Sequence, residues 1–227
     1  MALPSAAGSP CRQPALAMLD HSLRARHGFT MVELLVAMVL MFVVLGAIFG
    51  IWFGLQRAYT FTEDDMTAQQ QARSALAEMV ELIRTARRPE PAPSDDLNVV
   101  IYDADKNSLT LWTDVDRDPN HTLELVRFRV DAATRTLYRD TDTERTNDPT
   151  FSTGTSVRLV SNWVSNDDDT PLFSYVGADG RSLDCPVEDV NFIREVVIDL
   201  RIDVYEKNRP LVHHLRSVVQ PRNLRQY

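Results

Sequence analysis

The sequence has little cysteine and little glycine. Of its 227 residues, two are cysteine and eight are glycine. No CxxC pair occurs, which argues against a zinc or dithiol site, and so few glycines leave little material for a phosphate-binding loop. Serine, histidine and aspartate are present, but no spacing aligns them as a nucleophilic triad. The sequence therefore predicts a protein that is not an enzyme and that needs no cofactor.

Basic residues are also in the minority. The formal net charge is −8, from 24 basic and 32 acidic residues. Residues 1–28 carry three arginines and one aspartate, so the chain from Phe29 onward carries −10. Because affinity for nucleic acid requires clustered lysine and arginine, this charge argues against a general nucleic-acid-binding protein. It leaves room for a small local basic patch.

One long apolar run dominates the N-terminal part. Residues 29–55 follow a basic segment and contain a single carboxylate, Glu33. A helix needs about 20 residues to cross a bilayer, so this run predicts a transmembrane helix. A carboxylate near the start of such a span costs about 2–4 kcal/mol. We therefore expect Glu33 to have a functional partner, although a carboxylate at the membrane edge can also snorkel to water.

This run has two other interpretations. A cleaved secretory signal has a shorter apolar core and a small-residue cleavage site, which residues 55–59 do not provide. A plain signal anchor would use the same arginines to hold the N-terminus in the cytoplasm, and charge alone does not distinguish it. Residues 1–17 show no periodicity, and Met18 is an alternative start that would leave a short basic leader.

Residues 28–38, GFTMVELLVAM, resemble the N-terminal processing motif of type IV pilins and type II secretion pseudopilins. The resemblance implies a leader over residues 1–28, cleavage between Gly28 and Phe29 by the prepilin peptidase, and N-methylation of Phe29. It implies other pilins, the peptidase/methylase, an inner-membrane assembly platform and membrane lipid as partners. It also implies a single-pass inner-membrane protein with a cytoplasmic N-terminus and a periplasmic or extracellular head, which enters a pilus or pseudopilus on assembly.

The same resemblance gives roles to residues in the apolar helix. Glu33 would pair with the Phe29 amine of a neighbouring subunit and so set the axial register. Gly46, Gly50 and Gly54 recur every four residues and would let helices approach closely, although transmembrane helices use glycine generically. The chain departs from many pilins in two ways: it has no proline near Gly50, and after cleavage Cys185 would have no cysteine partner.

Residues 56–88 predict a second, amphipathic part of the helix. No glycine or proline occurs between Leu55 and Pro89, and apolar residues recur at three-to-four spacing from Ala68 to Ile83. Pro89 is expected to end the helix. One continuous helix over residues 29–88 and two helices with a break near residues 54–57 are both compatible with the sequence.

Residues 89–227 predict a β-rich extracytoplasmic head. After a proline-rich linker, short β-branched runs alternate with polar turns. Strands are expected near residues 98–102, 108–112, 122–130, 136–140, 156–160, 172–176, 194–205 and 211–219. Turns are expected at residues 131–135, 178–180 and 207–210. The predicted fold class is α+β, with one antiparallel sheet packed on the end of the helix.

Three groups of side chains in the head are candidate sites. Asp103, Asp105 and Asn107 form one series and Asp114, Asp116 and Asp118 another, and both imitate the start of a calcium loop without its glycine. Turn chemistry explains such clusters equally well. His213 and His214 are consecutive in a strand, so they point to opposite faces and are expected to be structural. Trp112, Trp163 and Tyr175 would form either a recognition patch or, as we favour, part of the core.

The function predicted from the sequence is that of a minor pilin or pseudopilin subunit, processed by the prepilin peptidase and assembled into a filament, where a large head suits the tip. Pilus, secretion and competence systems share this design. A membrane-anchored binding module, such as an adhesin or a DNA-uptake tip, is one alternative. A signal-anchored extracytoplasmic domain is the other.

Overall fold

The computed structural model describes residues 28–117, 119, 122–204 and 212–222. Met18, the leader up to residue 27, Asp118 and the expected turn at residues 207–210 lie outside these residues. The chain divides into two compact units, Met1–Phe53 and Gly54–Tyr227.

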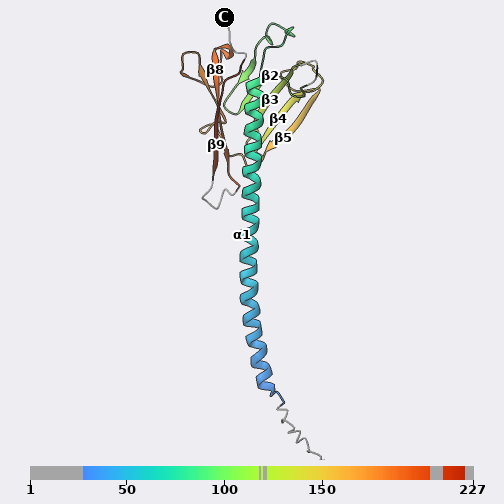
Figure 1. Cartoon of the computed structure of the whole chain (residues 1–227), viewed down its shortest axis with the longest axis vertical. Coiled ribbons are helices and arrows are strands. Elements are labelled where there is room, and N and C mark those ends of the chain that lie inside the picture. Colours follow the sequence, from blue (N-terminus) through green and yellow to red (C-terminus); the bar gives the residue numbers. More distant parts are fainter. Residues whose placement is uncertain (1–27, 118, 120–121, 205–211, 223–227) are drawn as a thin grey trace, which may run out of the picture. The chain divides into compact units, whose positions relative to one another are not determined.

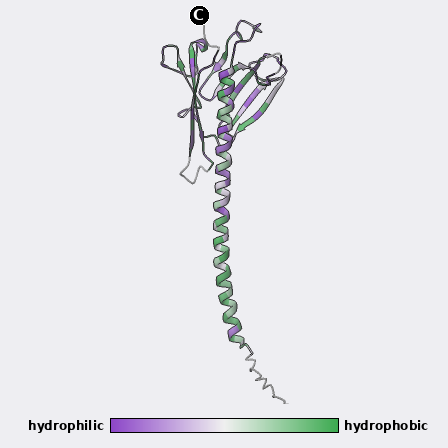
Figure 2. Cartoon of the chain, in the orientation of Figure 1, coloured by the Kyte–Doolittle hydropathy of each residue, from purple (hydrophilic) through white to green (hydrophobic). Residues whose placement is uncertain are grey.

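One helix, α1 (Met31–Thr85), runs without interruption through the apolar and amphipathic segments. The structure therefore has one helix where the sequence left two open. Its N-terminal part is long and apolar enough to cross a membrane, and none of its most apolar stretch is buried. Figure 2 shows this change along α1, from mostly hydrophobic residues at its N-terminal end to mixed residues further on.

The helix ends three residues before the predicted position. Thr113 Oγ donates to the Leu82 carbonyl over 3.1 Å and so satisfies a carbonyl of the last turn. The Arg87 amide then donates to the Trp112 carbonyl over 3.1 Å. These two hydrogen bonds connect the end of the helix to the strand that contains Trp112 and Thr113. Helical geometry is also disfavoured at Arg88, because this residue precedes Pro89.

The first sheet has five strands in sequence order: β1 (Ile101–Ala104), β2 (Ser108–Thr113), β3 (Glu124–Asp131), β4 (Thr136–Asp142) and β5 (Thr155–Ser161). All neighbouring pairs are antiparallel. The expected turn at residues 131–135 joins β3 to β4, and Arg135 takes a positive φ of 53° there.

The second sheet has the order β7 (Ser182–Leu183), β6 (Phe173–Gly177), β8 (Ile193–Ile202) and β9 (His213–Val219), with a short 3-10 helix, η1 (Val190–Phe192), before β8. The prediction of a single sheet is therefore wrong, while the α+β class is confirmed. The sheets are separate because β5 pairs with β4 and β6 pairs with β8. The chain between β5 and β6 forms an isolated bridge from Val164 to Ile202 and adds no strand to either sheet.

Both sheets bury one face against the C-terminal part of α1, which lies between them in Figure 1. The helix contributes three alanines and two larger residues to this core, Ala68, Ala72, Ala75, Met79 and Ile83. The spacing of these residues confirms the predicted buried face. Trp112 and Tyr175 are buried, as expected for core residues, and the Tyr175 hydroxyl donates to the Asp105 carbonyl over 2.8 Å.

Candidate functional site

Thr30 and Glu33 cap the N-terminus of α1 through reciprocal hydrogen bonds. Glu33 Oε2 accepts from the Thr30 amide over 3.1 Å and from Thr30 Oγ over 3.2 Å. In return, Thr30 Oγ accepts from the Glu33 amide over 3.2 Å. This is a capping box, in which two otherwise unpaired amides of the first turn are satisfied. The sequence signature Thr-x-x-Glu could have predicted it.

The capping box gives Glu33 a partner within its own chain. A carboxylate at a helix N-terminus is also favoured by the helix dipole. Both effects lower the cost of holding this charge at the edge of an apolar span. Any pairing of Glu33 with an amine from another subunit would therefore compete with, or be added to, a local role that the sequence analysis did not consider.

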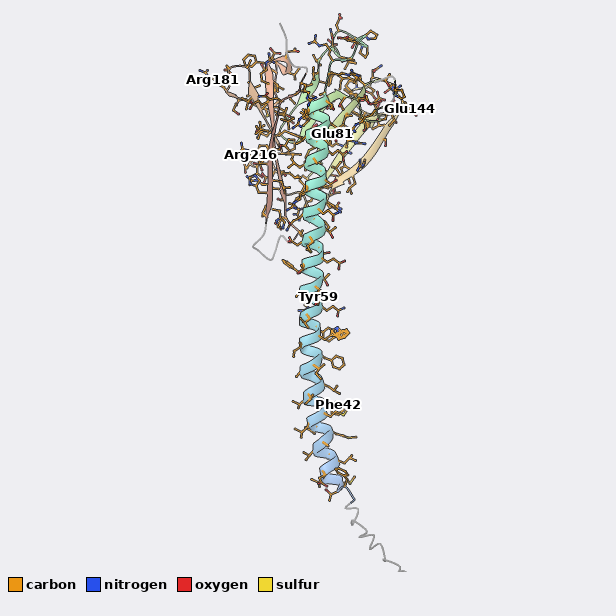
Figure 3. The ribbon with its side chains drawn as sticks, viewed as in Figure 1. Phe42, Tyr59, Glu81, Glu144, Arg181 and Arg216 are labelled. Atoms are coloured by element: carbon orange, nitrogen blue, oxygen red, sulfur yellow. The ribbon has the colours of Figure 1, made fainter. Side chains whose placement is uncertain are left out.

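The side chains of the apolar part of α1 are exposed. From Met31 to Thr60 every residue except Leu45 is exposed, and Figure 3 shows the labelled Phe42 and Tyr59 projecting away from the helix. At Gly46, Gly50 and Gly54, a Cβ atom would meet nothing within 4 Å among the described residues. Packing inside this chain therefore does not require glycine at these positions.

In the first calcium candidate, Asp105 and Asn107 accept hydrogen bonds from backbone amides. Asp105 Oδ1 accepts from the Lys106 amide over 2.8 Å. Asn107 Oδ1 accepts from the Leu172 amide over 3.2 Å, which ties this turn to the strand connection before β6. Burial raises the pKa of Asp103, and the nearby Asp105 carboxylate raises it further. Among the described residues, neither Asp103 nor Asp105 belongs to a group of three His, Cys, Asp or Glu side chains that could hold a metal ion.

Two members of the second candidate, Asp114 and Asp116, lie close to Glu124, while Asp118 lies outside the described residues. Carboxylate oxygens of Asp114, Asp116 and Glu124 lie within 4.8 Å of one another. Burial raises the pKa of Glu124, whereas hydrogen bonds from the Val115 amide and Arg145 lower it. Arg145 Nη2 lies 3.2 Å from Glu124 and 3.9 Å from Asp116, so an arginine already balances part of this charge.

The two histidines point to opposite faces of β9, as expected. His213 Nε2 lies 2.6 Å from Asp65 on α1, and His214 Nε2 lies 2.6 Å from Asp199 on β8. Each ring therefore has its own carboxylate partner, which agrees with separate structural roles.

Two arginine-rich clusters in the first sheet were missed by the sequence analysis. Buried Asp140 accepts from Arg127 and Arg129, at 2.6 and 2.8 Å. On the opposite face, Glu78 of α1 binds Arg139 at 2.6 Å and Arg158 at 3.4 Å. The spacing Arg-x-Arg in β3 indicates that two arginines share a face, but their partners come from other strands and from the helix.

Comparison with known protein families identifies one segment. Residues 23–49 match the prokaryotic N-terminal methylation motif. This match covers the predicted cleavage position, the capping box and the first part of the apolar helix. No curated protein shows significant similarity to the chain. The matched segment continues directly into the long apolar helix α1, and this motif and the α+β architecture fit a pilin-like chain.

Proposed function

We propose that this protein is a minor pilin or pseudopilin subunit whose task is assembly. The prepilin peptidase cuts between Gly28 and Phe29 and methylates Phe29. The observation that carries the proposal is the methylation motif at residues 23–49, which leads into a helix whose apolar side chains are exposed. Such a helix needs either lipid or other helices around it.

In this proposal the helix exchanges lipid for the helices of neighbouring subunits. Open space at Gly46, Gly50 and Gly54 supports a packing role outside the chain. The processed N-terminus at Phe29 carries an amine, and Glu33 lies one helical turn further on. Pairing of this carboxylate with the Phe29 amine of a neighbour would neutralise two charges in an apolar bundle, and a wrong axial register would leave both unpaired.

The C-terminal unit, Gly54–Tyr227, bears two sheets of five and four strands. A subunit with so large a unit is accommodated most easily at or near a filament tip, where it meets few neighbours. Before assembly, the protein sits in the inner membrane with its N-terminus in the cytoplasm, in accord with the arginines that precede the span.

The test replaces Glu33 with Ala in the full-length chain in its native cell. The variant is expected to insert into the membrane at the normal level but to be absent from purified filaments. Wild-type incorporation of Glu33→Ala would contradict the proposed role of this carboxylate in assembly. A Gly28→Ala variant provides the matched processing test: an uncut chain that still assembles would contradict the requirement for cleavage.

A further inference from the structure

Strand β5 is the last strand of the five-stranded sheet. Among the described residues it pairs with β4 alone, so its other edge is open. An open edge presents unpaired backbone amides and carbonyls that can bind another extended chain. Residues 155–159 pair regularly with residues 138–142, and the only register shift lies beyond them, near Leu137. The edge is thus a regular template over these five residues.

The outer face of this edge is apolar. Val157 and Leu159 are 56% and 47% exposed, although both are large hydrophobic side chains. Successive strand residues point to opposite faces, so the two lie together on the face away from α1. Beside them on β4, Tyr138 lies under the Arg129 guanidinium, 4.8 Å from the ring centroid. Aromatic and arginine side chains held in place in this way are typical of protein-binding surfaces.

The inner face of the edge borders a groove of about 530 Å³ between α1 and the sheet. Ser74, Ala77 and Glu78 of α1 line it on one side, and Arg139 of β4 and Arg158 of β5 on the other. A strand added beside β5 would place every second side chain above this groove, because the added strand continues the pleat of the sheet.

Three acidic and three basic residues line the groove, and two of the arginines, Arg139 and Arg158, lie on the strands β4 and β5. Glu78 is shared by Arg139 and Arg158, so two guanidinium groups face one carboxylate. Arg139 Nε is buried and has no hydrogen-bond partner among the described residues, and a buried donor without an acceptor is costly. Arg158 is the only charged residue of β5 and its side chain is 57% exposed. An incoming acidic side chain would supply the missing acceptor.

We propose that the open edge of β5 is a docking site for an extended acidic strand of a partner protein. The strand would alternate apolar side chains, which cover Val157 and Leu159, with acidic side chains, which meet Arg158 and Arg139 over the groove. This site is independent of the apolar helix and of processing at Gly28, so it goes beyond the proposed function in filament assembly.

The test uses the full-length chain in detergent and a blocked peptide of about eight residues in which glutamate and valine alternate, a length that matches β5. Saturable binding is expected, with slower hydrogen exchange of the amides in residues 155–161. A peptide with lysine in place of glutamate is expected not to bind, because lysine meets Arg158 as a like charge.

Two variants and one matched control locate the site. Arg158→Glu and Leu159→Asp are each expected to weaken binding by at least about tenfold. Val218→Asp is the control, because Val218 is 53% exposed on β9, the edge strand of the other sheet; this variant is expected to bind like the wild type. Denaturant unfolding of each variant shows whether a loss of binding reflects a loss of folding. Leu159→Asp changes no ion pair and so keeps the test informative should Arg158→Glu disturb the contact with Glu78.

Three results would overturn the proposal. The first is no binding of the glutamate–valine peptide up to about 1 mM, the weak end of specific recognition, in which case Arg158 only keeps the edge from pairing. The second is equal weakening by Leu159→Asp and Val218→Asp. The third is self-association of the chain through β5 without peptide binding, which would make a second copy the occupant.

Discussion

Glu33 has a local role as a helix cap and a proposed role as the partner of a neighbouring subunit's amine, and variants of the capping box can distinguish the two. Three variants are compared in full-length protein: Thr30→Ala, Glu33→Gln and Glu33→Ala. Thr30→Ala removes the hydroxyl that accepts from the Glu33 amide. Glu33→Gln keeps a side-chain oxygen that can accept from the Thr30 amide but removes the charge, and Glu33→Ala removes both.

The expected magnitudes differ enough to decide between the two roles. Loss of an N-cap hydroxyl typically costs about 1 kcal/mol, or roughly a fivefold effect on an assembly equilibrium. A buried amine left without its carboxylate costs about 3–5 kcal/mol, or more than roughly a hundredfold. If Glu33 pairs with the amine of a neighbour, Glu33→Gln and Glu33→Ala fail alike and Thr30→Ala is mild. If Glu33 acts only as a cap, Glu33→Gln assembles almost normally.

The assay measures, for each variant, the amount of subunit in sheared filaments relative to the amount in the membrane fraction. We expect a drop of at least about a hundredfold for both Glu33 variants and less than about tenfold for Thr30→Ala. Near-normal incorporation of Glu33→Gln would refute the register argument and leave capping as the explanation. Equal membrane levels of all three variants exclude a failure of insertion.

Three further predictions concern the C-terminal unit. Asp140→Ala is expected to lower the free energy of unfolding by about 2–4 kcal/mol in denaturant titrations, because it leaves Arg127 and Arg129 without their carboxylate partner. A loss below about 0.5 kcal/mol, within the range of ordinary surface changes, would contradict this. Hydrogen bonds from Ser152 and Thr150 lower the pKa of Asp148, so its stabilisation of the β4–β5 loop is present above the ordinary value of 3.8 and is lost as pH falls below it; the protection of the Thr150 and Ser152 amides against hydrogen exchange, relative to their intrinsic rates at each pH, should fall only in that range. Calcium at about 1 mM, within the range of weak extracellular sites, should raise the melting temperature of Arg145→Ala more than that of the wild type, because the variant frees Glu124; equal responses would show that the arginine does not protect the cluster.

Much of the fold could be predicted from local sequence patterns. The absence of glycine and proline between Leu55 and Pro89, with apolar residues at helical spacing, predicted the amphipathic part of α1 and its buried face. The β-branched runs expected as strands near residues 122–130 and 194–205 predicted most of β3 and β8. Both signals come from residues close in the sequence, where the period of the backbone imposes the pattern.

Features that depend on long-range pairing could not be predicted in this way. The division into two sheets depends on how the connection between β5 and β6 crosses the molecule, which no local pattern records. Glu124 joins the acidic group only because β2 and β3 pair and bring it next to Asp114. Likewise, Glu78 meets Arg139 and Arg158 across the helix–sheet interface, so the groove beneath β5 becomes visible only in the folded chain.

The proposed function requires that a prepilin-type leader is removed and that the mature chain then begins at Phe29. The most direct test is the intact mass of the mature protein recovered from cells, supported by N-terminal sequencing. We expect a chain that begins at Phe29 and carries one additional methyl group on its amine. A chain that still begins upstream of residue 29 would contradict the account and would make the protein a membrane-anchored domain that does not enter a filament.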